Sequence, residues 1–185
     1  AVGALQLALT LEYLEEEFYR LALESGVLPG GTRAEKVYMQ IKKHESAHVE
    51  FLNSGLGDNS IASPEFDFTV GGMFDPFNEN NSGQEVAYAQ LLALAQAFED
   101  TGVRAYKGQA GNLMGTPFLT PALQIHSVEA RHASEIRRLR ASVMEESTNQ
   151  NALGWITLNT RGPGMPAETQ DVYDGEENVI QGGVN

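Results

Sequence analysis

The chain has 185 residues, of which 42% are hydrophobic, with a formal net charge of −13 and no cysteine. This length suits a single domain with a sizeable core. The negative charge disfavours binding to nucleic acids and anionic membranes. The lack of cysteine excludes disulfides, thiolate catalysis, iron–sulfur clusters and cysteine-based zinc sites. No apolar run is long enough to span a bilayer.

Apolar residues at steps of three and four predict four helices, over about residues 4–24, 33–53, 84–107 and 121–144. Thr32, followed three residues later by Glu35, is typical of a helix N-cap. Gly55 and Gly57 are expected to end the second helix. The late arginines of the fourth helix, including Arg137 and Arg140, suit the negative end of a helix dipole.

Two further segments lack this periodicity. Residues from about 55 to 82 are rich in Gly, Pro, Asn and Asp, with spaced phenylalanines. A loop this long inside a domain is unusual, and a crossover along a bundle explains it, since a 20-residue helix is about 30 Å long. Residues 146–185 form an acidic, turn-rich tail. We therefore expect an all-α four-helix bundle over residues 1–145, with a long crossover between helices 2 and 3. The tail would pack on the bundle or on a neighbouring subunit.

Each predicted helix carries a glutamate within its apolar stripe, where an apolar residue is expected. These glutamates are Glu12, Glu45, Glu99 and Glu129. His48 follows Glu45 by three residues and His132 follows Glu129 by three, so each pair shares one helix face. The pattern also repeats between the two halves of the chain, because Tyr19 follows Glu12 by seven residues and Tyr106 follows Glu99 by seven.

Charge explains why this pattern predicts a metal site. Four ionised carboxylates buried together repel one another, and each costs several kcal/mol to remove from water. Two divalent cations neutralise four carboxylates, and two neutral imidazoles complete the ligand set. Mixed carboxylate and imidazole ligands suit manganese or iron, and zinc also accepts them.

The sequences "LTLEYLEEEFYRLAL", "HESAHVEFL", "FEDTGVRAYKGQA" and "VEARHASEIRRLR" resemble the ferritin-like superfamily. More narrowly, they resemble the bacterial and plant ferritin-like family that includes desiccation-related proteins, and more distantly the manganese catalases. The resemblance implies a di-metal centre, with Glu12 and Glu99 as terminal ligands, Glu45 and Glu129 as bridging ligands, and one histidine on each ion.

The same resemblance implies candidate catalytic residues. In manganese catalases the carboxylate before the second histidine can instead handle protons, so Glu129 has two candidate roles. Tyr19 and Tyr106 are expected to hydrogen-bond to ligands on the opposite helix. The implied activity is redox chemistry on peroxide or oxygen, as in a catalase or a ferroxidase. Metal storage, or a structural role in assembly or stress, is the alternative.

Other interpretations of the same residues stay open. His44 to His48 also match H-E-x-x-H, the zinc signature of metalloproteases, although that reading leaves the other ligands unexplained. Glu16 is an alternative to Glu12 as ligand, whereas Glu15 and Glu17 are expected to face solvent. His44 is expected near the ligands or at the surface. His126 is a candidate third imidazole near the cluster, although a surface position is favoured. We further expect a homo-oligomer, and an exported bacterial protein because the sequence lacks an initial Met and cysteine.

Overall fold

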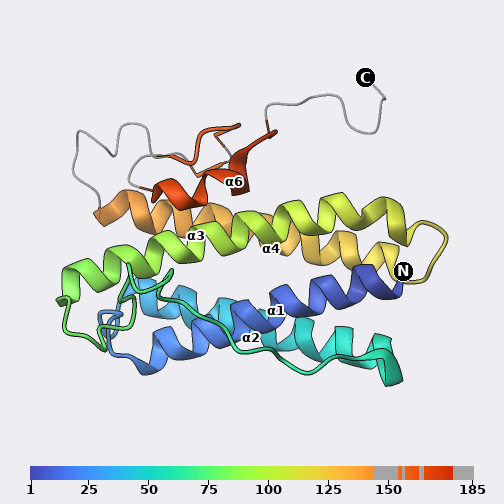
Figure 1. The fold of residues 1–185 in the computed structure, drawn as a ribbon, viewed down its shortest axis with the longest axis horizontal. Coiled ribbons are helices and arrows are strands. Elements are labelled where there is room, and N and C mark those ends of the chain that lie inside the picture. Colours follow the sequence, from blue (N-terminus) through green and yellow to red (C-terminus); the bar gives the residue numbers. More distant parts are fainter. Residues whose placement is uncertain (144–153, 156, 163–164, 177–185) are drawn as a thin grey trace.

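Four long helices form two helical hairpins that pack against each other in the computed structural model (Figure 1). α1 (Val2–Glu24) pairs with α2 (Arg33–Leu56), and α3 (Gln84–Gln109) pairs with α4 (Leu119–Val143). The structure describes residues 1–143, 154–155, 157–162 and 165–176, and these residues contain helices and no strand. The predicted all-α bundle is therefore confirmed.

Local sequence signals explain both ends of α2. The side chain of Thr32 accepts a hydrogen bond from the backbone N–H of Glu35, as the predicted N-cap requires. At the other end, Gly57 ends the helix with a φ of 53°, a left-handed conformation that favours glycine. Gly55 remains inside the helix, contrary to expectation, and a Cβ atom there would lie 2.7 Å from the ring of Phe118. This glycine therefore serves packing between the hairpins.

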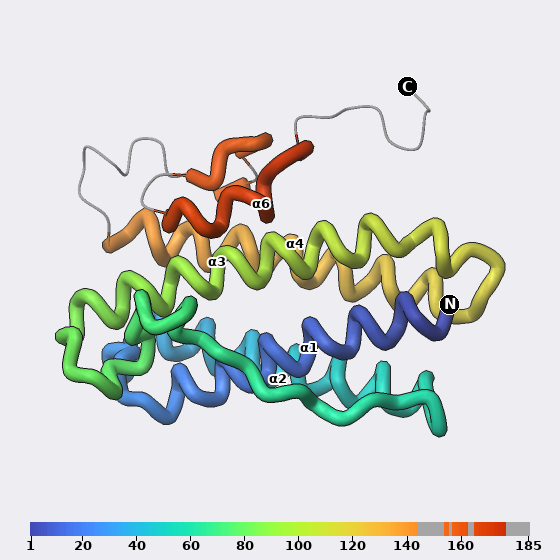
Figure 2. Tube along the Cα trace, in the orientation of Figure 1, coloured from blue at the N-terminus to red at the C-terminus, as the bar shows by residue number. Residues whose placement is uncertain are grey.

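The segment between α2 and α3 crosses the length of the α1–α2 hairpin, as Figure 2 shows. A short 3₁₀ turn (Gly57–Asn59) begins it. Phe68 and Phe77 then pack on Phe18 of α1, with ring centroids 5.5 and 5.9 Å apart, and Phe68 also contacts Phe98 of α3. These phenylalanines give the crossover an apolar anchor in the core.

Part of the C-terminal segment lies over α3 and α4 (Figure 1). It contains a 3₁₀ turn (Ala167–Thr169) and the short helix α6 (Gln170–Tyr173). Tyr173 is fully buried and packs with Met165 against alanines of α3. In contrast, Trp155 and Leu158 of the same segment are largely exposed. Ile156, Val179 and Ile180 lie outside the described residues.

A buried polar network fastens α6 to the bundle. Arg137 on α4 contacts Oδ2 of Asp100 on α3 at 2.6 Å, and the Tyr173 hydroxyl donates to the same oxygen at 2.7 Å. Arg140 donates to Gln96, which also bonds Tyr173. The prediction that these arginines serve the end of the helix was therefore incomplete, because both are buried and hold polar side chains.

None of the helices in the described part of the chain has the length and hydrophobicity needed to cross a membrane.

Candidate metal centre

The six side chains predicted as metal ligands come together inside the bundle, between the two hairpins. They are Glu12 on α1, Glu45 and His48 on α2, Glu99 on α3, and Glu129 and His132 on α4. The four carboxylates are completely buried, His132 is 5% exposed, and the His48 side chain is 12% exposed. Each histidine follows a glutamate by one helical turn, so both point toward the same interior.

The ligand atoms form two overlapping groups, and within each group all of them lie within 4.8 Å of one another. The first, which we call the His48 position, consists of Glu12, Glu45, His48 and Glu129. The second, the His132 position, consists of Glu45, Glu99, Glu129 and His132. Two of the carboxylates therefore belong to both positions.

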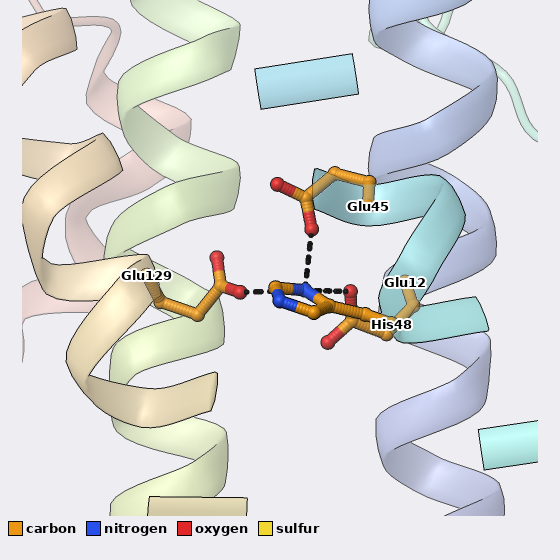
Figure 3. A group of neighbouring side chains, drawn as sticks. All are labelled: Glu12, Glu45, His48 and Glu129. Atoms are coloured by element: carbon orange, nitrogen blue, oxygen red, sulfur yellow. Dashed lines mark hydrogen bonds and ion pairs between the residues drawn. The ribbon is translucent and has the colours of Figure 1, made fainter. Parts of the chain in front are cut away.

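Each shared carboxylate presents a different oxygen to each histidine. Nδ1 of His48 lies 2.9 Å from Oε2 of Glu45 and 3.2 Å from Oε1 of Glu129 (Figure 3). Nδ1 of His132 lies 3.0 Å from Oε1 of Glu45 and 3.5 Å from Oε2 of Glu129. This is the geometry of carboxylates that can bridge two ions, and it favours the bridging role of Glu129 over a role outside the ligand set.

Several of these atoms converge without forming hydrogen bonds. Nδ1 of His132, Oε1 of Glu45, Oε2 of Glu99 and both oxygens of Glu129 are buried and have no hydrogen-bond partner. An unsatisfied buried polar atom costs about 1–3 kcal/mol, so five in one place need an explanation. Cations at the two positions would satisfy all of them, and the donor types suit iron or manganese. The residues present therefore fit a pair of transition-metal ions.

The charges of the metal-free cluster shift the pKa of both histidines. Burial alone would lower the pKa of His48, but its contacts with Glu12, Glu129 and Glu45 outweigh burial and raise it to about 12. His132 is also buried, and the same carboxylate contacts, with Glu99 in place of Glu12, raise its pKa well above the usual value. In the absence of metal the imidazoles thus keep protons and act as the counter-charges of the cluster.

The pKa values of the carboxyl groups shift in different directions, depending on which side chains each group contacts. Burial would raise the pKa of Glu45, but its contacts with both histidines lower it to about 2. Burial raises the pKa of Glu12 and Glu99 well above the usual value, and repulsion from neighbouring glutamates adds to the effect. Metal ions that bound here would therefore have to displace protons from the histidines and from Glu12 and Glu99.

The two tyrosines connect the hairpins crosswise. The hydroxyl of Tyr19 on α1 donates to Oε1 of Glu99 on α3, and the hydroxyl of Tyr106 on α3 donates to Oε1 of Glu12 on α1. Burial raises the pKa of both tyrosines, so they remain neutral donors. Each outer carboxylate is thereby oriented by the opposite hairpin.

The neighbouring acidic residues of α1 occupy different environments from those expected. Glu15 was predicted to face solvent, which is wrong, because it is only 2% exposed and lies beside the cluster. Its position three residues after Glu12 and four before Tyr19 was the sequence signal for this burial. Glu16 lies outside both ligand positions and bonds the hydroxyl of Ser46 at 2.7 Å, so the structure does not support it as a ligand. Glu17 is partly exposed and pairs with an arginine.

The two remaining histidines bind no cluster carboxylate. His44 is half-buried and bonds Nε2 of His132 through its own Nδ1 at 2.8 Å. It belongs to neither ligand position, so the zinc-protease interpretation loses its first ligand. His126 lies 3.0 Å, through Nδ1, from the backbone carbonyl of Val103. It is not a third imidazole of the cluster.

Two helical hairpins that enclose four glutamates and two histidines define a helix bundle of the carboxylate-and-histidine metal-site class. The model of the ferritin-like domain family matches residues 1–142, and the chain belongs to this family. The comparisons with curated proteins and with solved structures gave no match.

Proposed function

We propose that this ferritin-like protein binds two manganese or iron ions and uses them in redox chemistry on peroxide or oxygen. The observation that carries the proposal is the pair of shared carboxylates, Glu45 and Glu129, each of which faces both histidines with separate oxygens. Four carboxylates balance two divalent ions in charge, so bound ions would offset the cost of burying these carboxylates. A bound pair of such ions supplies two-electron redox chemistry.

The residues of the chain have distinct tasks in this proposal. Glu12 and Glu99 each hold one ion, and the tyrosines that donate to them keep one oxygen of each carboxylate fixed. Once a metal ion has displaced the proton of the carboxyl group, the hydrogen bond from the neutral tyrosine stabilises the ionised form. Burial of the whole cluster keeps bulk water from competing for the ions.

The first test is metal content. Protein purified without chelators should hold about two transition-metal ions per chain, as the ligand set of such bundles requires. His48→Gln and His132→Gln should each lower this content, because each removes one nitrogen ligand. Glu16→Gln is the matched control, since Glu16 lies on the same helix as Glu12 but outside both positions. Full metal content in both histidine variants would refute the proposed site.

The second test is turnover. Protein loaded with manganese should evolve oxygen when peroxide is added, or protein loaded with Fe(II) should consume oxygen, as followed with an oxygen electrode. Glu16→Gln should keep this activity, and His132→Gln should lose it. Two bound ions without either reaction would refute the redox function and leave metal storage as the role of the site.

A further inference from the structure

The two halves of the chain differ at two positions in the immediate surroundings of the ligands, those of Glu15 and His44. Glu12 and Glu99 occupy the same place in the two halves, so Glu15 corresponds to Gly102. The two E-x-x-H sequences likewise place His44 where the second half has Val128. A symmetric ligand set is therefore surrounded by side chains that are not symmetric.

The first difference concerns the outer nitrogen of His132. Nδ1 of this ring faces the carboxylate oxygens, so Nε2 carries the proton when Nδ1 binds a metal. Nδ1 of His44 lies 2.8 Å from this Nε2, and the two rings stack with an interplanar angle of 11°. With a metal on Nδ1 of His132, His44 accepts the Nε2 proton through its own Nδ1. Its Nε2 then carries a proton toward the side-chain amide of Gln40, which lies 2.6 Å away. A fixed outer hydrogen bond orients a ligating imidazole and increases its basicity.

His48 has no equivalent partner. In the described part of the chain, the hydrogen bonds and ion pairs of His48 all involve Nδ1, and none involves the outer nitrogen. The residue in the matching place, Val128, has no polar side chain. The two histidine ligands are therefore not equally oriented.

The second difference adds a buried carboxyl group, that of Glu15. Glu15 is 2% exposed and comes from α1 opposite Gly102 of α3. A Cβ atom on Gly102 would lie 3.3 Å from Oε1 of Glu15 and 3.6 Å from Oε2 of Glu129. Glycine thus leaves room for Glu15 beside the Glu129 oxygen that faces His132.

Both differences act at the same place. We propose that the two metal positions are unequal and that the His132 position, supported by His44 and Glu15, binds its ion more tightly and fills first. The inference rests on the proposed two-metal site, but it does not depend on turnover. His44 acts by orienting His132, and Glu15 acts by placing a fifth carboxylate beside this ion.

Titration of the metal-free protein with Mn(II), followed by calorimetry, tests the inference. The wild-type protein should bind two ions in separate steps whose affinities differ at least tenfold. His132→Gln should abolish the tighter step, and His48→Gln the weaker step. Two wild-type steps of equal affinity, or loss of the weaker step in His132→Gln, would overturn the inference, whereas absence of binding would refute the two-metal site itself.

Variants of His44 separate orientation from packing. His44→Phe keeps an aromatic ring against His132 but cannot accept its proton, and should weaken the tighter step about 10- to 100-fold while leaving the weaker step unchanged. His44→Asn places Oδ1 where Nδ1 was and should restore most of the affinity. The orienting role of His44 would be overturned if His44→Phe weakened both binding steps equally or neither of them. It would also be overturned if His44→Asn did not restore the affinity of the tighter step.

Glu15→Gln replaces the carboxyl group by an amide of similar volume and tests the contribution of Glu15. It should weaken the tighter step more than the weaker one, whereas Glu16→Gln should change neither. A uniform effect of Glu15→Gln on both steps, or no effect, would show that Glu15 does not distinguish the two positions. Circular dichroism of each variant checks that the helices remain. If one variant does not fold, the variants at the other residue still test whether the two metal positions differ in affinity.

Discussion

Removing the metal should make the stability of this protein depend steeply on pH. In the metal-free fold the surrounding carboxylates raise the pKa of His48 to about 12 and that of His132 also far above its usual value. In the unfolded chain a histidine has a pKa of about 6.5. The folded protein therefore holds two protons that the unfolded chain has lost, over a wide range above neutral pH.

The direction and size of this change in stability with pH follow from the protons that the folded and unfolded states bind. Because the folded pKa values are raised, the stabilisation is complete below about pH 6.5 and is lost as the pH rises toward the folded values. Each histidine contributes a slope of about 1.4 kcal/mol per pH unit, so the pair contributes up to about 2.7 kcal/mol per unit. For a domain of this size the melting temperature should fall by about 5–10 °C per pH unit. The raised pKa values of Glu12 and Glu99 act in the same direction.

Calorimetry of chelator-treated protein between about pH 7.5 and 9 measures this slope. The double variant His48→Gln/His132→Gln should lose most of it, because neither glutamine binds a proton. Protein loaded with Mn(II) should also lose most of it, because metal-bound imidazoles are neutral. A melting temperature of the metal-free wild type that stays constant across this range would refute the reasoning that the histidines are the counter-charges of the empty cluster.

Three further substitutions test other contacts. Arg137→Met should lower the free energy of unfolding by about 3–5 kcal/mol in urea, because Asp100 stays buried without the arginine that pairs with it. Arg138 is exposed, so Arg138→Met should have little effect, and an equal loss in both variants would contradict the role of Arg137. Tyr106→Phe removes the hydroxyl that donates to Glu12, and should weaken Mn(II) binding at the proposed His48 position about tenfold in calorimetry. Unchanged affinity would show that Tyr106 does not orient Glu12. Thr32→Ala should cost about 1 kcal/mol in thermal unfolding through loss of the α2 cap, whereas Thr32→Ser should cost less.

The sequence predicted the bundle and the converging ligands because both have regular spacing. A glutamate inside an apolar stripe already faces the interior, so the backbone period alone places Glu45 and Glu129 there. The crosswise bonds of Tyr19 and Tyr106 could be anticipated because the same spacing of seven residues occurs in both halves. Repetition turned a common motif into a specific one.

The features that the sequence did not predict depend on contacts between distant segments. Glu15 is buried because Gly102, on another helix, leaves space for it. Arg137 is buried because Asp100 and Tyr173 surround it, and Tyr173 comes from a four-residue helix without a periodic signal. Helical spacing defines which face a residue occupies, but the neighbouring segment decides whether water reaches that face.

Neither hairpin forms a complete metal position by itself, because each position and each tyrosine hydrogen bond combines residues of both hairpins. Each contributes one outer glutamate, one E-x-x-H pair, and the phenol that steadies the other's carboxylate. The six-residue arrangement therefore has approximate two-fold symmetry, with one half supplied by each hairpin. Because both hairpins belong to one polypeptide and differ in sequence, His44 and Glu15 each occur once, and the two ends of the centre have different surroundings.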